Sequence, residues 1–436
     1  MKDGALIIWS LSGLPFVGAL TSLLFWSDPE RLKLSSIVWS VVSLASIVGF
    51  ANQLMIPPEG LLPLYLLPLT AVISLLGQPS HVDHRLGWIM TLIFLGLGLC
   101  AVMNELPFSS LALMVLFSIV AVLLYRHHSV FWPMSWWGIG TYVLGALCAA
   151  LSLMTTAPLS SVASVVASAI LLPLMPFHDG HLTALTRLPG NLPSFIVLLL
   201  PTIGLHGLAI VLPTVPDAVA GTVSFFALVG AFYGAVKALA QTRVRLLLAY
   251  ASLSFFSMLW WFAASTRSAT PRSALLVGTI GLATSGLLVA WQVVRTRYGD
   301  DVDPQAVSGL ASGMPRYAVL LSLLALAAMG LPPFGVFAGF MGLLLTSPFP
   351  SSAGLVITLL AWLAASWYIM QMVQRLLFGL RRPELRYTDV LRTELAALTI
   401  VVLVLLALGL APATLFAPDQ TSSAAHAVTG SLVWNR

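Results

Sequence analysis

The sequence predicts an all-α integral membrane protein with about fourteen transmembrane helices. Of its 436 residues, 59% are hydrophobic and only 8% are charged, whereas a soluble domain carries about 25% charged residues. Apolar runs of roughly 20 residues, the length that crosses a bilayer, recur along the whole chain. A chain this apolar cannot cover itself with polar surface in water, so lipid is the expected solvent for most of it.

We place the transmembrane helices by this length criterion, starting from the first residue. The first apolar run lacks a basic leader and a small-residue cleavage site, so it is expected to be the first helix of the mature protein. The predicted helices are 4–26, 35–55, 60–77, 86–103, 107–125, 132–154, 159–177, 191–212, 218–241, 246–265, 273–295, 317–346, 353–379 and 395–416. They predict one membrane domain over residues 1–416, no soluble domain, and a flexible C-terminal tail over residues 417–436.

The basic residues predict the orientation of these helices. Of the 20 Lys and Arg residues, four lie in loops on one side, and Lys237 lies inside a span. The loops of the other side hold Arg31, Lys33, Arg85, Arg126, Arg187, Arg243, Arg245, Arg295, Arg297, Arg316, Arg375, Arg381, Arg382, Arg386 and Arg392. Because cytoplasmic loops carry the excess of Lys and Arg, we expect a multi-pass protein of the inner (cytoplasmic) membrane with both termini on the non-cytoplasmic side. This loop charge sets orientation, and no nucleic-acid partner is predicted.

Lys237 and His206 are titratable side chains that fall inside predicted spans. A charge at the bilayer centre costs at least about 2.5–3.5 kcal/mol on insertion scales, so each is a candidate functional residue. Lys237 lies one turn before the end of its helix, where it either snorkels to the interface or relays protons. His206 lies within helix 191–212 and either relays a proton near neutral pH or packs as a hydrogen-bonded imidazole.

Proline residues break two of the predicted helices. They are Pro173 and Pro176 in the seventh helix, and Pro332 and Pro333 in the twelfth. Proline removes a backbone donor and frees a carbonyl, and in a membrane such breaks persist only where protein or trapped water satisfies the freed groups. A pair of broken helices at matching positions of two halves is typical of transporters with internal repeats. Simple packing kinks are the alternative.

His178 and His181 follow the first break, with Asp179 between them. Two histidines and a carboxylate where a helix ends make this segment a candidate proton pathway. The spacing of the histidines could suit a metal, but no third ligand is evident, so no metal site is predicted. Cys100 and Cys148 fit neither a zinc site nor a redox pair. Because the sequence also lacks a nucleotide loop and a nucleophilic triad, it predicts no cofactor and no catalytic residue.

Several motifs resemble those of the antiporter-like membrane subunits found in respiratory complex I, Mrp cation/proton antiporters, membrane-bound hydrogenases and two-component inorganic-carbon transporters. The similarity covers roughly residues 100–395. It rests on Pro176-Phe-His178, on Thr202-Ile-Gly-Leu-His-Gly207, on Gly230-Ala-Phe-Tyr-Gly-Ala235 with the stretch from Gln241 through Tyr250 to Ser254, and on Gly330-Leu-Pro-Pro-Phe-Gly335.

The resemblance implies fourteen core helices with both termini outside, a broken seventh and a broken twelfth helix, and two inverted five-helix repeats over about 86–212 and 218–379. It also implies a proton-translocating subunit of a multisubunit complex. The expected partners are the lipid bilayer, other membrane subunits and a peripheral cytoplasmic subunit.

The chain departs from this family at the buried charges. The family's lysine in the seventh helix falls on Leu171, and its charged residue in the twelfth helix falls near Phe340. Thr202 stands where some members carry a lysine, and the glutamate of the fifth helix has no counterpart in residues 109–124. Proton transfer needs titratable groups joined by water. Those that remain are His178, His181, His206 and Lys237.

Three functions therefore stay open, because function belongs to sites rather than to folds. The first is an antiporter-like subunit that translocates protons or couples their movement to a partner. The second is an inorganic-carbon (bicarbonate or CO2) uptake subunit, driven by proton flow with a peripheral zinc-containing partner. The third is a non-conducting structural subunit. Candidate positions for docking a cytoplasmic partner are Arg243, Arg245, Arg381 and Arg382, with membrane-surface charge as the alternative.

Overall fold

The structure is a computed structural model that describes residues 2–53, 58–104, 107–127, 136–156, 158–298, 307–346, 351–379 and 388–411. Within these ranges the chain is helical and contains no strand. Its α-helices are α1 (Lys2–Leu23), α2 (Pro29–Phe50), α3 (Pro58–Leu76), α4 (Arg85–Met103), α5 (Phe108–Arg126), α6 (Trp136–Met154), α7 (Leu159–Leu171), α8 (Asp179–Arg187), α9 (Leu192–Val211), α10 (Asp217–Leu239), α11 (Val244–Thr266), α12 (Pro271–Tyr298), α13 (Leu310–Gly313), α14 (Pro315–Ala328), α15 (Gly335–Thr346), α16 (Ser352–Leu377) and α17 (Arg392–Leu410). The predicted tail over residues 417–436 lies outside the described residues.

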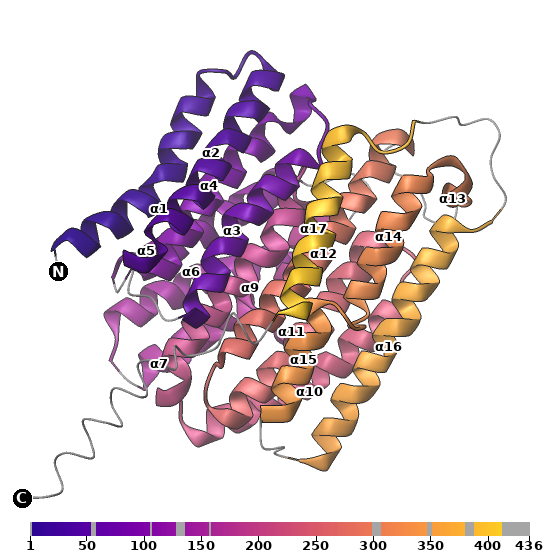
Figure 1. Cartoon of the computed structure of the whole chain (residues 1–436). Coiled ribbons are helices and arrows are strands. Elements are labelled where there is room, and N and C mark those ends of the chain that lie inside the picture. Colours follow the sequence, from indigo (N-terminus) through magenta and orange to yellow (C-terminus); the bar gives the residue numbers. More distant parts are fainter. Residues whose placement is uncertain are drawn as a thin grey trace, which may run out of the picture.

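The long helices are apolar enough to cross a membrane. Eleven helices in the described part meet both the length and the composition that a span needs. Four further apolar helices are shorter and lie in α3, α7, α14 and α15. The predicted class, a multi-span all-α membrane protein, is confirmed. Figure 1 shows the helices side by side in one bundle, with α1 and α2 at one edge and α14 and α16 at the opposite edge.

The second helix begins earlier than hydropathy predicted. We expected it to start at residue 35, but α2 starts at Pro29. The Asp28 carboxylate accepts hydrogen bonds from the backbone N–H groups of Glu30 and Arg31, at 3.1 and 3.3 Å. This N-cap, followed by a proline at the first helical position, starts the helix inside a charged segment that hydropathy assigns to a loop.

Helix α12 lies at the centre of the bundle and packs against α3, α9, α11, α14, α15 and α17. Its whole membrane-length window is buried. Gly281 makes the contact with α9 close, because a Cβ atom at this position would lie 3.0 Å from the Leu198 Cα. Small residues allow such close helix contacts in membranes, where apolar packing replaces the hydrophobic driving force of water.

Both predicted helix breaks are present. Helix α7 ends at Leu171 and α8 begins at Asp179. Helix α14 ends at Ala328 and α15 begins at Gly335. The proline pairs that predicted these breaks lie in the two irregular segments between the helices, so proline chemistry alone located both interruptions.

At the first break, the Leu174 N–H donates to the Ala169 carbonyl at 3.1 Å, which is one residue wider than an α-helical turn. The carbonyl of Leu172 is freed from the helix and accepts from Trp260 Nε1 of α11, at 2.9 Å. The protein itself therefore satisfies a backbone group that lipid could not.

The second break repeats this arrangement. The Leu331 N–H donates to the Leu326 carbonyl at 3.2 Å. The Met329 carbonyl accepts from Trp362 Nε1 of α16, at 2.9 Å. The spacing is the same in both breaks. The carbonyl that accepts from tryptophan lies three residues after the carbonyl that accepts in the widened turn, at Leu172 after Ala169 and at Met329 after Leu326.

Candidate functional site

The segment over residues 172–178 and the start of α8 hold His178 against α10. Its imidazole is almost buried, and the ring centroid lies 5.4 Å from that of Tyr233, edge to face. Its Nδ1 lies 3.3 Å from the carbonyl of Pro176, and its Nε2 lies 3.8 Å from Asp179 Oδ1. The Asp179 side chain keeps 42% of its surface exposed, so the group joins a buried imidazole to an accessible carboxylate.

Helix α10 extends this group to Lys237. The Lys237 Nζ lies 5.7 Å from the centroid of the Tyr233 ring, within cation–π range. The Tyr233 ring also lies 6.0 Å from that of Tyr250 in α11. Gly234 makes this approach possible, because a Cβ there would lie 2.9 Å from the Tyr250 carbonyl oxygen. Lys237 itself is exposed on the surface of the isolated chain.

His181 lies one turn further along α8 and points to α11. It is 1% exposed, and its Nε2 lies 2.8 Å from Ser252 Oγ. Ser252 Oγ also donates to the Ala249 carbonyl at 3.0 Å. Since the hydroxyl has one proton to give, the imidazole Nε2 is the donor in the His181–Ser252 hydrogen bond. Phe256 packs edge-on against the imidazole.

The four predicted pathway residues lie in two separate parts of the structure. Three of them, His178, His181 and Lys237, lie around the start of α8. His206 lies in α9, half-buried. In the described part of the chain, no hydrogen bond, ion pair or ring contact of the structure involves it. The predicted motif residue Tyr250 belongs to the first group through its contact with Tyr233.

The candidate docking residues differ in their surroundings. Arg243 precedes α11 and is exposed. Arg245 is half-buried, and its Nη1 donates to the Thr186 carbonyl at 3.2 Å, so it holds the end of α8. Arg381 and Arg382 lie outside the described residues.

Sequence reasoning did not select Tyr233 and Ser252. Tyr233 separates His178 from Lys237, and Ser252 is the hydrogen-bond partner of His181. Both lie within the motif stretches that carried the resemblance. The signal was therefore present, but hydropathy gives no reason to single out a tyrosine or a serine in a helix.

The chemistry available at this site is proton transfer. Two imidazoles, a carboxylate and an ammonium group lie around one helix break, and each can accept or donate a proton. Over the described ranges, no three His, Cys, Asp or Glu side chains gather as a metal site would require. We refer to His178, Asp179, His181, Tyr233, Lys237, Tyr250 and Ser252 as the first-break cluster.

Comparison with known proteins identifies the family. Residues 108–366 match the family described as "NADH:quinone oxidoreductase/Mrp antiporter, TM". The chain belongs to this family. The match covers more than half of the chain and includes both breaks and the whole first-break cluster, so the resemblance predicted from the motifs is confirmed.

Two relatives illustrate the relationship. NADH-quinone oxidoreductase subunit M of Escherichia coli is 27% identical over 280 residues, which are 61% of this chain and 53% of that protein. NADH-quinone oxidoreductase subunit N of Syntrophotalea carbinolica is 33% identical over 221 residues, 47% of this chain and 44% of the relative. The chain thus spans about half the length of the curated relatives it matches.

Solved structures share the fold over almost the whole chain. A chain of respiratory complex I from Thermus thermophilus with bound NADH has a TM-score of 0.76 at 19% identity, covering 94% of this chain and 96% of that one. A chain of the membrane-bound sulfane sulfur reductase, an archaeal respiratory membrane complex, has a TM-score of 0.80 at 16% identity, covering 93% and 76%. The Mrp complex from a Dietzia species gives 0.72 at 15% identity, covering 94% and 98%.

Proposed function

We propose that this chain is the membrane subunit of a multisubunit complex and translocates protons through the first-break cluster. The observation that carries the proposal is the contact series from Lys237 over Tyr233 to His178, with Asp179 at its exposed end. Titratable side chains within a membrane are rare and mark proton relays. Here they gather at the first of the two positions where a broken helix supplies irregular backbone.

Protons would pass between these groups through water. The 3.8 Å between His178 Nε2 and Asp179 Oδ1 exceeds a direct hydrogen bond, and a bridging water suits such a separation. The imidazole exchanges the proton, the carboxylate receives or supplies it at the accessible end, and the Lys237 ammonium places a positive charge on the other side of the Tyr233 ring. The Tyr233 ring sets the distance between the lysine and the imidazole.

We propose that the second break carries no protons. Residues 315–346, which include α14, the break and α15, contain no Asp, Glu, His or Lys. Aromatic rings fill the space beside this break instead. The ring centroids of Phe340 and Trp362 are 3.5 Å apart, and Phe262 lies 6.3 Å from Phe340. These packed aromatic side chains leave no room for a chain of water molecules. We therefore expect no proton conduction through this half of the chain.

We also propose the fourteen-span arrangement with two inverted repeats over about 86–212 and 218–379, inside one membrane domain over residues 1–416. Counting α7 with α8, and α14 with α15, as one broken span each supports this number. The matching widened turns and tryptophan-bound carbonyls of the two breaks support the repeats, because related halves are expected to place broken helices at corresponding positions.

The orientation with both termini outside the cytoplasm, in the inner membrane, is part of the proposal. Contacts of basic residues support the two predicted sides of the membrane. On the predicted cytoplasmic side they join neighbouring helix ends and turns: Arg85 to the Ser27 carbonyl, Lys33 to the Gln78 carbonyl, Arg245 to the Thr186 carbonyl and Arg297 to Glu394. On the opposite side Arg267 binds Asp217 and the Val215 carbonyl. The exposed Arg243 suits a peripheral cytoplasmic partner.

Proton flux into liposomes that contain the whole complex tests the function. We expect Lys237→Leu and His178→Ala to reduce flux strongly, while Lys237→Arg, which keeps the charge, retains most of it. His81→Ala is a matched control, because His81 is an exposed loop histidine. Unchanged flux in both Lys237→Leu and His178→Ala would assign the chain to the non-conducting alternative. The aromatic packing beside the second break favours that alternative.

A further inference from the structure

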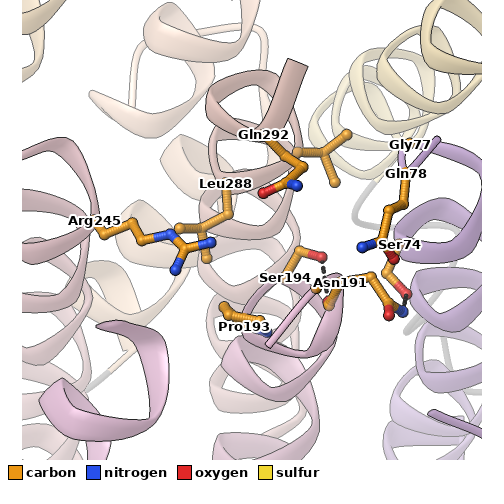
Figure 2. Close-up of a pocket in the computed structure, with 11 residues that line it drawn as sticks. Ser74, Gly77, Gln78, Asn191, Pro193, Ser194, Arg245, Leu288 and Gln292 are labelled. Atoms are coloured by element: carbon orange, nitrogen blue, oxygen red, sulfur yellow. Dashed lines mark hydrogen bonds between the residues drawn. The ribbon is translucent and has the colours of Figure 1, made fainter. Parts of the chain in front are cut away.

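A small cavity lies between α3, α9, α11 and α12, outside the first-break cluster. Its polar lining consists of Ser74, Gln78, Asn191, Ser194, Arg245 and Gln292 (Figure 2). The centre of a water-sized sphere has about 10 Å³ in which to move inside this cavity. This is room for about one water molecule and for nothing larger.

Asn191, which lines this cavity, has an unused side-chain acceptor. Its Nδ2 donates to Ser74 Oγ at 3.1 Å and to Thr91 Oγ1 at 2.8 Å. Each hydroxyl already donates its own proton to a backbone carbonyl, that of Ala71 or Gly87, so both oxygens must accept here. This fixes the orientation of the amide. Asn191 Oδ1 is then a buried acceptor without a partner among the described residues.

Gln78 presents an unused donor. Trp88 Nε1 donates to Gln78 Oε1 at 3.0 Å. An indole nitrogen can only donate, so the Gln78 oxygen is fixed on the Trp88 side and its nitrogen points the other way. Gln78 Nε2 has no hydrogen-bond partner within the described part of the chain. The two side chains are buried, with 1% of Gln78 and 3% of Asn191 exposed.

We propose that this cavity is a binding site for one structural water molecule, which accepts from Gln78 Nε2 and donates to Asn191 Oδ1. A buried donor and a buried acceptor without partners are each destabilising, and one water satisfies both. A simple anion has no proton to donate to Asn191 Oδ1 and would leave that acceptor unpaired, and the small volume excludes lipid headgroups. The water joins α3 to the start of α9, and it positions the short turn between α8 and α9. This inference does not depend on proton translocation by the chain.

Direct observation is the first test. We expect a cryo-electron microscopy map of the complex, at a resolution that shows ordered waters, to contain one peak within about 2.7–3.2 Å of both Gln78 Nε2 and Asn191 Oδ1. An empty cavity would overturn the proposal. So would a protein side chain bonded to both atoms.

A cavity-filling variant gives a second test, because it should lower Tm if the cavity holds water and should not lower it if the cavity is empty. Ser194→Thr keeps the hydroxyl that donates to the Asn191 carbonyl at 2.7 Å and adds one methyl group to the lining. If the cavity holds water, the methyl displaces it, and we expect Tm to fall by a few degrees relative to Ser36→Thr. Ser36 is a buried helical serine elsewhere, whose Oγ donates to the Leu32 carbonyl. A Tm equal to or above that of Ser36→Thr would mean that the methyl filled empty space, and the proposal would fall.

Discussion

Arg297 at the end of α12 and Glu394 at the start of α17 form a buried ion pair, with Nη2 2.6 Å from Oε2. Their side chains keep only 8% and 2% of their surface exposed. Arg297 also donates to the carbonyls of Thr388 and Asp389. The Glu394 side chain faces inward, although in the sequence it lies close to the loop that holds the docking candidates Arg381 and Arg382. Its role is to join two helices that are far apart in the sequence.

Removing the arginine of this pair is expected to destabilise the protein strongly. Arg297→Met leaves the Glu394 carboxylate buried without its partner, which lowers the free energy of unfolding by about 3–5 kcal/mol. Thermal unfolding in mild detergent measures this, with Arg375→Met as the control, since Arg375 is exposed in α16. Adding Glu394→Gln to Arg297→Met is expected to recover part of the loss. Equal stability of Arg297→Met and Arg375→Met would contradict the structural role of the pair.

The tryptophans at the two breaks are expected to matter for stability. Trp260→Phe keeps an aromatic ring but removes the donor to the Leu172 carbonyl, at a cost of about 1–3 kcal/mol for the unpaired buried group. We expect a similar loss for Trp362→Phe at the second break. Trp137→Phe is the control, because Trp137 is 77% exposed. Thermal unfolding in mild detergent measures these effects. Losses of stability no larger than that of Trp137→Phe would show that the two carbonyls find other hydrogen-bond partners.

At Tyr233, the ring rather than the hydroxyl is expected to matter. Tyr233→Phe keeps the ring beside both His178 and Lys237, so proton flux through the reconstituted complex should stay near the native rate. Tyr233→Leu removes the cation–π contact, worth about 0.5–1 kcal/mol, and should lower flux about two- to fivefold. Equal flux in the two variants would mean that the ring does not hold the cluster together.

The contact between α9 and α12 predicts a strong effect of a small substitution. In Gly281→Ala, the new methyl group would lie 3.0 Å from the Leu198 Cα, and overpacking a core by this amount costs about 1–3 kcal/mol. Gly140→Ala in α6 is the matched control, because nothing lies within 4 Å of its added Cβ. The two melting temperatures should differ by several degrees. Equal melting temperatures would mean that α9 and α12 can move apart without a loss of stability.

Orientation can be tested with single cysteines after Cys100 and Cys148 are replaced by serine. Ser27 and Ser268 are both exposed and lie on opposite predicted sides. A membrane-impermeant maleimide added to intact cells should label Ser268→Cys, and it should label Ser27→Cys only after the membrane is opened. The reverse pattern would place both termini in the cytoplasm.

The sequence by itself determined the class of the protein, many of its long apolar helices and both breaks. These features are local: a run of about 20 apolar residues crosses a bilayer wherever it occurs, and Pro173 or Pro332 interrupts a helix by its own geometry. The start of α2 was placed too late, because a capping aspartate and a proline outweighed hydropathy. The motifs around Gly230 and Gly330 were sufficient to indicate the family.

Only the tertiary structure decided which side chains meet. Tyr233 lies between Lys237 and His178, His206 lies apart from them, and Ser252 binds His181. Tyr233 and Lys237 are one turn apart in α10, but the His178–Tyr233 and His181–Ser252 contacts join different elements, so they depend on how the helices pack and rotate about their axes. Hydropathy carries no information on that rotation, because an apolar helix in lipid can bury any face. The packing of α10 and α11 against the first break therefore set the site.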